Sequence, residues 1–431
     1  MRHRLIRIFL GVAASTSLLS LLFVSTSLRI ESTDSHVAQT PSNLKRLLIE
    51  GRSQRFPSVD QRVRLYMTTW YNPACHDRVH YRVNGTNLQI TEVDRSKRRD
   101  EQRNLTVSPV VLPNILMYLT VPGVLECGDG DVYERNGHHS YCRELIGQTT
   151  LLGTVPPPLM QLGDLNATEN YGEVQLPFFR KFRLVHSTIS TTQFYHEGKP
   201  CWPITEPIIW KMDINRHFGP TAEVPKYDRS WQQKKNMAVF RGTLTGNLRV
   251  EDVWSDRMSD LEKCFTMIRC RLVYEHGNST LLDAKAMDTL GNIPDVINGV
   301  QMVAPFMSMG EQLAYKAIVM LEGNDVSSGL KWALCSNSVV LMQPPFFTSW
   351  AMEELLEPWV HYVPLNEDLS NVEERIQWVI DHDDEAHAIS RRATLWIYDL
   401  LFHPDAAQDE ARIQLEILRR YQSHFVLDPM T

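Results

Sequence analysis

The sequence predicts an α/β fold, and the clearest reason lies near residue 320. Ala317–Leu321 is an uninterrupted apolar run, typical of a strand buried on both faces. Glu322–Asp325 then breaks the pattern with turn-forming residues, and Ser327 or Ser328 is a candidate N-cap for a short helix. A second β-branched run follows at Ser338–Leu341. Strand, polar loop, helix and strand make a βαβ unit, whose two strands should be parallel.

A second strand-to-loop junction supports the same fold class. Met237–Phe240 predicts a buried strand, and Arg241–Arg249 follows it with two glycines and two arginines. Such a loop offers backbone N–H groups to a diphosphate, with arginine as the charge partner. It is not a P-loop, which would have Lys-Ser or Lys-Thr after the second glycine. Because open α/β sheets bind ligands at the carboxyl ends of their strands, this loop and Glu322–Ser328 are the predicted places for a phosphorylated ligand. The alternative is that both are ordinary loops of an α/β protein.

Length and charge limit the classes of function. The chain has 431 residues, of which 43% are hydrophobic, which is enough for two domains. The net charge of −7 argues against a nucleic-acid-binding protein.

The N-terminus predicts entry into the secretory pathway. Arg2, Arg4 and Arg7 precede the uncharged segment Ile8–Leu28. We favour a signal anchor over residues 1–30, because this segment is longer than the apolar part of a typical signal peptide. A cleaved signal peptide is the alternative. The polar residues 31–60 then form a stem. The expected location is the endoplasmic reticulum or Golgi, as a single-pass type II membrane protein with a lumenal domain, or as a secreted or lumenal protein after cleavage.

Sequons and cysteines agree with a lumenal protein. Four Asn-X-Thr sequons predict glycosylation at Asn84, Asn104, Asn166 and Asn278. The seven cysteines contain no CxxC pair, which disfavours zinc and thioredoxin-type chemistry. In an oxidising lumen we expect three disulfides and one free thiol, with a pairing that the spacing does not determine.

The N-terminal half has shorter strand-like runs, at Val79–Val83, Leu88–Val93 and Val107–Leu112. The segment Asp129-Gly-Asp131 is flanked by turn formers, so we interpret it as a turn and predict no metal site. At Asp164 a carboxylate follows a short apolar run, which places it at the end of a strand. An aspartate there is more often a turn former than a catalytic group.

Helices dominate the C-terminal part. Ser370–Glu373 has the pattern of a capping box at the start of one helix. The apolar faces of three successive helices are formed, in order, by Val372, Ile376 and Val379; by Ala386, Ile389, Ala393, Trp396, Ile397 and Leu400; and by Ile413, Ile417, Tyr421 and Phe425.

The stretch Tyr315–Leu341 resembles the C-terminal signature of the Rumi and capsule-associated glycosyltransferases, glycosyltransferase family 90, which includes the protein O-glucosyltransferases. The similarity continues through Pro358–Leu365 and extends upstream to Met160. The resemblance implies a GT-B-like fold of two Rossmann-like lobes with C-terminal helices: residues 61–205 on the acceptor side and residues 206–431 binding the nucleotide sugar. It further implies a UDP-sugar donor carrying glucose or xylose, a hydroxyl acceptor on a protein or glycan, inversion at the sugar, and no cofactor or metal.

The resemblance also implies roles for individual residues. Asp164 matches the family's catalytic base. The nucleotide-sugar site would contain Arg241, Gly242, Thr243, Arg249, Glu322, Gly323, Ser327 and Lys331. One position departs from the family pattern: Gly329 stands where better-known members have an arginine that contacts the diphosphate. This difference puts in question how the diphosphate is neutralised.

Two rival functions belong to other classes. A non-catalytic lumenal module that binds glycans or proteins would keep the fold without the reaction, and the missing arginine motivates this alternative. A hydrolase has no support, because the sequence lacks GxSxG, HExxH and a cleanly spaced pair of carboxylates.

Overall fold

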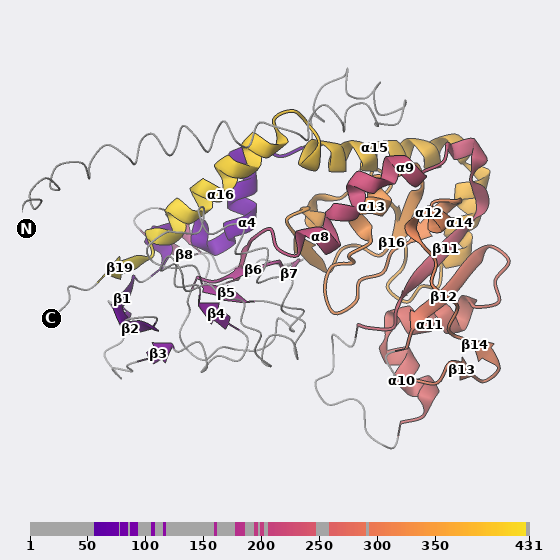
Figure 1. The fold of residues 1–431 in the computed structure, drawn as a ribbon, viewed down its shortest axis with the longest axis horizontal. Helices are drawn as coiled ribbons and strands as arrows, with labels where there is room; N and C mark the ends of the chain where they lie inside the picture. The colour runs from indigo at the N-terminus through magenta and orange to yellow at the C-terminus, as the bar shows by residue number, and fades with distance from the viewer. Residues whose placement is uncertain are drawn as a thin grey trace, which may run out of the picture.

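A computed structural model describes residues 56–76, 78–84, 87–93, 105–107, 115–117, 159–161, 177–185, 194–196, 199–201, 206–246, 258–289 and 293–427. Its largest sheet confirms the predicted α/β class (Figure 1). The five strands are β11 (Lys235–Thr243), β12 (Leu282–Asp288), β15 (Tyr315–Val319), β16 (Val339–Met342) and β18 (Val363–Pro364). Their order is β12-β11-β15-β16-β18, and every neighbouring pair is parallel.

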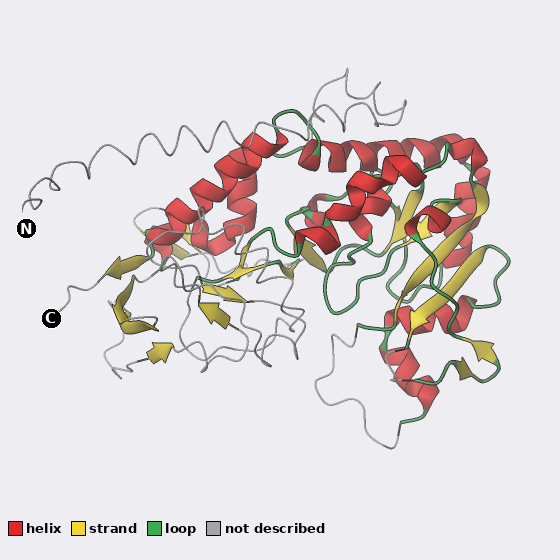
Figure 2. Ribbon diagram, viewed as in Figure 1, coloured by secondary structure: helices red, strands yellow, loops and turns green. Residues whose placement is uncertain are grey.

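Helices cover both faces of this sheet (Figure 2). They are α10 (Asp260–Thr266), α11 (Ile268–His276), α12 (Met309–Gln312), α13 (Leu330–Leu334), α14 (Val372–Asp381) and α15 (Asp383–Leu401). Alternate residues of β15 point to opposite faces: Ala317 and Val319 pack with α11 and α14, whereas Ile318 packs with α13. All five residues of β15 are buried, which explains the uninterrupted apolar run.

The predicted βαβ unit is confirmed, but its helix is not capped as expected. β15 and β16 are parallel and α13 lies between them in the chain. Gly329 occupies the N-cap position without a side-chain hydrogen bond, and the Ser327 hydroxyl contacts Met320 Sδ at 3.8 Å instead. The prediction of a serine cap was therefore wrong.

The prediction of a capping box at Ser370–Glu373 was also wrong. Asn371 precedes α14 and makes no side-chain cap, while the Ser370 hydroxyl donates to Asp368 Oδ1 at 2.6 Å. Asp368 lies two residues away, so a local turn satisfies the hydroxyl before the helix begins.

The N-terminal half contributes smaller sheets. β1 (Val79–Asn84), β2 (Asn87–Val93) and β3 (Leu105–Val107) form one sheet with β19 (Phe425–Leu427). A second sheet contains β4 (Ile115–Met117), β5 (Leu159–Gln161), β6 (Phe179–Arg180) and β10 (Ile208–Ile209). The pairs are β7 (Phe182–Leu184) with β17 (Phe347–Ser349), β8 (Phe194–His196) with β9 (Lys199–Cys201), and β13 (Val296–Ile297) with β14 (Val300–Gln301). Among the predicted strands, Val79–Val83 and Leu88–Val93 are confirmed, whereas β3 ends where Val107–Leu112 was expected to begin. The two-lobe GT-B-like arrangement stays a prediction.

The two ends of the described chain pack together. Helix α4 (Val59–Met67) contacts α16 (Ala406–Gln422), drawn in indigo and yellow in Figure 1. Strand β1 pairs in parallel with β19. Phe425 lies in β19 and not on the last helix, because α16 ends at Gln422. The closing helix and strand therefore contact segments from before residue 84.

Short helices connect these parts. They are α8 (Ile214–His217), α9 (Val224–Tyr227), and the 3-10 turns η1 (Thr68–Tyr71), η2 (Pro73–Cys75), η3 (Gly219–Glu223), η4 (Trp231–Gln233) and η5 (Glu353–Leu355). A disulfide joins Cys264 to Cys270 across α10 and α11. Cys75 is also disulfide-bonded, and Cys335 is a buried free thiol.

Within the described ranges, no helix is long and apolar enough to cross a bilayer. The predicted anchor at residues 1–30 and most of the stem lie outside those ranges, as do Asn104 and Asn166. Asn278 is exposed in the connection between α11 and β12.

The packing of α16 generates a stability prediction. Ile417 is fully buried between α16 and the main core, so Ile417→Ala should lower the free energy of unfolding by about 2–5 kcal/mol. Leu415 on the same helix is 57% exposed, and Leu415→Ala should change it by less than about 0.5 kcal/mol. Urea unfolding of both variants measures the difference. Equal losses would contradict the assigned helix face.

Candidate functional site

The order of the strands marks one edge of the parallel sheet as a ligand site. From β11 the chain moves to β12 on one side, and then returns to β15 on the other side of β11. The direction of winding therefore reverses between β11 and β15. In open α/β sheets, ligands bind outside the carboxyl ends of the strands at such a switch point. Here the loops at that point are Leu244–Gly246 after β11 and Met320–Ser328 after β15.

A buried arginine on α11 joins the ends of the two strands. Arg269 donates from Nε and Nη2 to the Leu321 carbonyl, at 3.1 and 2.7 Å. Its Nη1 donates to the Thr243 carbonyl and to Thr245 Oγ1, both at 3.1 Å. Burial lowers the pKa of Arg269 to about 10, so the guanidinium keeps its charge at neutral pH. A positive charge therefore lies directly beneath the switch point.

The two loops also contact each other through glycines. A Cβ added to Gly323 would lie 2.6 Å from Thr245 Oγ1, so only glycine fits this approach. Gly246 has φ +117°, a conformation that favours glycine, and its N–H donates to Asn324 Oδ1 at 3.1 Å. The loops thus form one structural unit.

Glu322 ties the second loop to the next strand. Its carboxyl accepts hydrogen bonds from the Phe346 and Phe347 N–H groups at 3.1 and 3.0 Å. Burial raises the pKa of Glu322 to about 8, against these hydrogen bonds, which lower it. The side chain consequently holds a proton at neutral pH.

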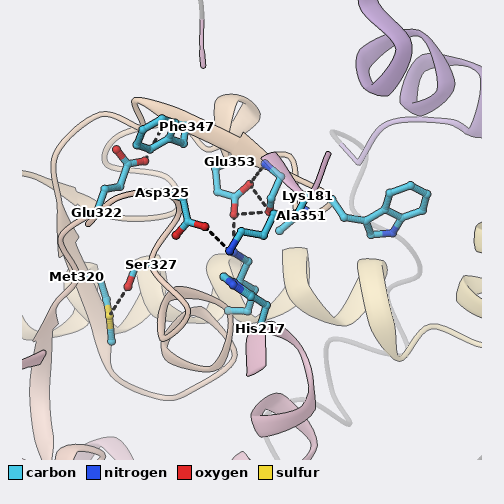
Figure 3. A network of polar contacts seen from close by, with 12 residues as sticks. Lys181, His217, Met320, Glu322, Asp325, Ser327, Phe347, Ala351 and Glu353 are labelled. Atoms are coloured by element: carbon cyan, nitrogen blue, oxygen red, sulfur yellow. Dashed lines mark hydrogen bonds and ion pairs between the residues drawn. The ribbon is translucent and has the colours of Figure 1, made fainter. Parts of the chain in front are cut away.

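A group of buried charged side chains lies beside and within the loop that follows β15 (Figure 3). Lys181 Nζ lies 2.5 Å from Asp325 Oδ2, and Lys331 Nζ lies 2.8 Å from Glu353 Oε1. The Ser349 N–H donates to Glu353 at 2.7 Å. Because all four charged side chains are at most 8% exposed, each charge depends on its partner for compensation.

His217 borders this group from α8. Burial, followed by the charges of Lys331 and Lys181, lowers the pKa of His217 well below its ordinary value. The imidazole is therefore neutral at physiological pH and adds no positive charge to the cluster.

An open cavity of about 480 Å³ lies on the α13 side of the sheet. Met287, near the carboxyl end of β12, lines it together with Trp332 of α13. The remaining lining residues are Gly219, Pro220, Glu223, Tyr227, Phe306, Met307, Met309 and Gln312. Aromatic side chains offer flat surfaces on which a ring can stack, and methionine side chains offer flexible, polarisable ones.

Comparison with known proteins identifies the domain that contains this site. Residues 222–406 match Glycosyl transferase family 90. This part of the chain is a family 90 glycosyltransferase domain. The chain is 44% identical over 235 residues to O-glucosyltransferase LpsA of Dichelobacter nodosus, an alignment covering 54% of this chain and 64% of that protein.

Animal relatives are more distant. Human Protein O-glucosyltransferase 1 is 26% identical over 267 residues, covering 61% of each chain. Protein O-glucosyltransferase 2 of Danio rerio is 26% identical over 202 residues, covering 44% of this chain and 34% of the relative. The alignments thus span less than two thirds of the length of these relatives. They confirm the resemblance to family 90.

Some of the predicted site residues of the family 90 domain come together in the structure. Glu322, Gly323 and Ser327 lie in the single loop after β15, and Lys331 follows in α13. Lys331 is fully buried and its charge is already paired with Glu353. Asp164 and Arg249 lie outside the described residues.

The residues after Phe240 differ from expectation. Strand β11 continues through Gly242 and Thr243, so the predicted glycine loop begins only at Leu244. Arg241 lies within the strand, where Nη2 pairs with Asp283 Oδ1 at 2.7 Å and Nη1 donates to the Asp283 carbonyl. Parallel pairing with β12 keeps these residues in the strand. The binding roles proposed for Arg241, Gly242 and Thr243 stay predictions.

Sequence reasoning missed Arg269, Lys181, Glu353 and His217. Arg269 contacts residues 24 to 52 positions away, and Lys181 lies 144 positions before Asp325. No local motif signals such contacts. Only the serine at 349, four residues before Glu353, gives a weak hint of a local carboxylate contact.

Glu322 generates a pH prediction. The native carboxyl keeps its proton up to about pH 8, whereas the unfolded chain releases it near the ordinary value of 4.5. Between these pH values the native state binds more protons, so stability falls as pH rises, by up to about 1.4 kcal/mol per pH unit. Glu322→Gln keeps an acceptor for the two N–H groups and removes the titration. Its unfolding free energy should therefore fall less than that of the wild type between pH 5 and 8.

Denaturant unfolding at several pH values measures this difference. Glu385→Gln, at an exposed position of α15, is the matched control and should follow the wild type. Parallel curves for Glu322→Gln and the wild type would show that Glu322 does not titrate as assigned.

Proposed function

We propose that this chain transfers a sugar from a UDP-sugar to a hydroxyl of a protein or glycan acceptor, with inversion and without a metal. The observation that carries the proposal is the buried, charged Arg269 beneath two joined loops at the switch point of a family 90 domain. A fixed positive charge behind backbone N–H groups favours a diphosphate and stabilises it as it departs. Glucose is the first candidate sugar, because the relatives described above are named O-glucosyltransferases.

In this reaction, the two halves of the chain have different roles. Asp164, on the acceptor side, would take the proton of the attacking hydroxyl as its oxygen bonds to the sugar carbon. The bond from that carbon to the diphosphate oxygen breaks, and the electron pair leaves with UDP. Arg269 supplies charge beneath the loops, while Arg249 and Arg241 are the further candidates for the diphosphate. The aromatic and methionine-lined cavity provides a surface for a ring of the donor.

Secretory location belongs to the same proposal. A lumenal enzyme explains the predicted anchor at residues 1–30, the four sequons and the disulfide between Cys264 and Cys270. Asn278 is exposed and open to glycosylation.

One observation favours the non-catalytic alternative. Gly329 stands where better-known members have an arginine, and a Cβ there would lie 3.2 Å from Met320 Sδ and Cε, so a larger residue would need the Met320 side chain to shift. A binding module without transfer would keep the fold and lack that charge. If the protein is an enzyme, the charge of Arg269 replaces that of the missing arginine.

A donor screen tests the proposal. Purified protein is incubated with UDP- and GDP-sugars, with and without EDTA, and the released nucleoside diphosphate is measured. UDP release should depend on acceptor, prefer UDP-glucose or UDP-xylose, and persist in EDTA. Asp164→Asn should lower the rate by roughly 10²–10⁴-fold, the usual contribution of a general base, with an unchanged melting temperature.

The opposite pattern separates the alternatives. If Asp164 is only a turn former, the variant melts at a lower temperature but keeps its turnover per folded molecule. If no nucleotide sugar is bound or turned over, the binding-module alternative replaces the enzyme.

A further inference from the structure

The loop after β15 is fixed by a side chain from the N-terminal half. Lys181 lies between β6 and β7, and its Nζ reaches Asp325 Oδ2 at 2.5 Å (Figure 3). The two side chains are only 3% and 8% exposed. Asp325 also accepts the Gly323 N–H through its carbonyl at 3.1 Å, so its position sets that of the glycine turn.

The surroundings of this ion pair link the same two segments. Strand β7 pairs with β17 in antiparallel register, and Phe182, Val326 and Phe347 form a small apolar cluster beside the pair. Glu322 binds the backbone at the start of β17. The loop Glu322–Ser328 is thus attached to the β7–β17 ribbon at Glu322 and again at Asp325 and Val326.

A second ion pair borders the first. Lys331 and Glu353 balance each other, and Ser349 of β17 donates to Glu353. Lys181 is thus the ion-pair partner of Asp325, and Lys331 is that of Glu353. Removing Lys181 would take away the positive charge that lies 2.5 Å from a buried carboxylate, which favours movement of that carboxylate toward water.

We propose that Lys181 is a positioning residue: its ion pair with Asp325 holds the loop Glu322–Ser328 in the conformation that accepts the donor diphosphate. This inference rests on the proposed donor site. Without the ion pair, only a fraction of molecules would hold the loop in the competent conformation, and the apparent donor affinity falls by that fraction. The chemical step, once the donor is bound, would be unchanged.

Lys181→Met tests this assignment, with Lys211→Met as the matched control. Lys211 is also a largely buried lysine, and it pairs with Glu410 at 2.6 Å, away from the loop. Lys181→Met should raise the donor KM about tenfold or more, with kcat within twofold of the wild type. Lys211→Met should leave the donor KM unchanged, whatever its melting temperature. Lys181→Arg should restore most of the affinity, because it restores the charge.

Hydrogen exchange without ligand makes the test independent of activity. In Lys181→Met, amides of residues 322–328 should exchange faster than in the wild type, and Lys181→Met with Asp325→Asn should slow them again. Lys211→Met should leave them as in the wild type. Faster exchange with no nucleotide-sugar binding by the wild type would overturn the proposed function alone.

Two results would overturn the positioning role. One is unchanged loop exchange in folded Lys181→Met. The other is an unchanged donor KM in a protein that has lost stability, which identifies a purely structural ion pair. If Lys181→Met does not fold, the double variant Lys181→Met with Asp325→Asn replaces it: its loop amides must exchange faster than those of Lys181→Arg, which keeps the charge.

Discussion

Arg269 is the interaction on which the candidate site depends. Its guanidinium uses three nitrogens to join the ends of β11 and β15, at the point where the winding of the sheet reverses. Carbonyl groups at strand ends lack the partners that they would have inside a sheet, and an arginine fork satisfies them together. The groups that it hydrogen-bonds are neutral, and the guanidinium keeps its charge at neutral pH beside the carboxyl groups of Asp325 and Glu322. The same contact therefore shapes the loops and makes their surroundings attractive to an anion.

The charges around Arg269 are arranged in buried pairs. Lys181 with Asp325 and Lys331 with Glu353 are nearly inaccessible to water. Buried ion pairs contribute little to the stability of the fold compared with apolar packing. Removing one partner of such a pair nevertheless destabilises the fold strongly, because the other charge stays buried. They fix a geometry instead. In this protein they fix the β15 loop against the β7–β17 ribbon, which links the segment before residue 185 to the parallel sheet.

The sequence predicted the parts of the fold that depend on local pattern. β11 and β15 were found because strands buried on both faces are continuous apolar runs, and the helices α14 and α15 because their apolar faces repeat every three to four residues. The predicted helix caps failed, because Ser327 and Ser370 found nearer partners in the folded chain. Gly323 was expected in the site, and the close approach of Thr245 gives the physical reason for it. Arg269 and Lys181 could not be predicted, since their partners are distant in the sequence and become neighbours only when the sheet forms.

The central claim is that a nucleoside diphosphate binds at the switch point between β11 and β15. A crystal structure of the protein with UDP tests it most directly. The diphosphate should lie at hydrogen-bond distance from backbone N–H groups of residues 244–246 or 322–328, with the Arg269 guanidinium still joining Thr243 and Leu321 beneath it. UDP bound at another edge of the sheet, or on the sheet formed by β1, β2, β3 and β19, would rule out the switch point as the nucleotide site.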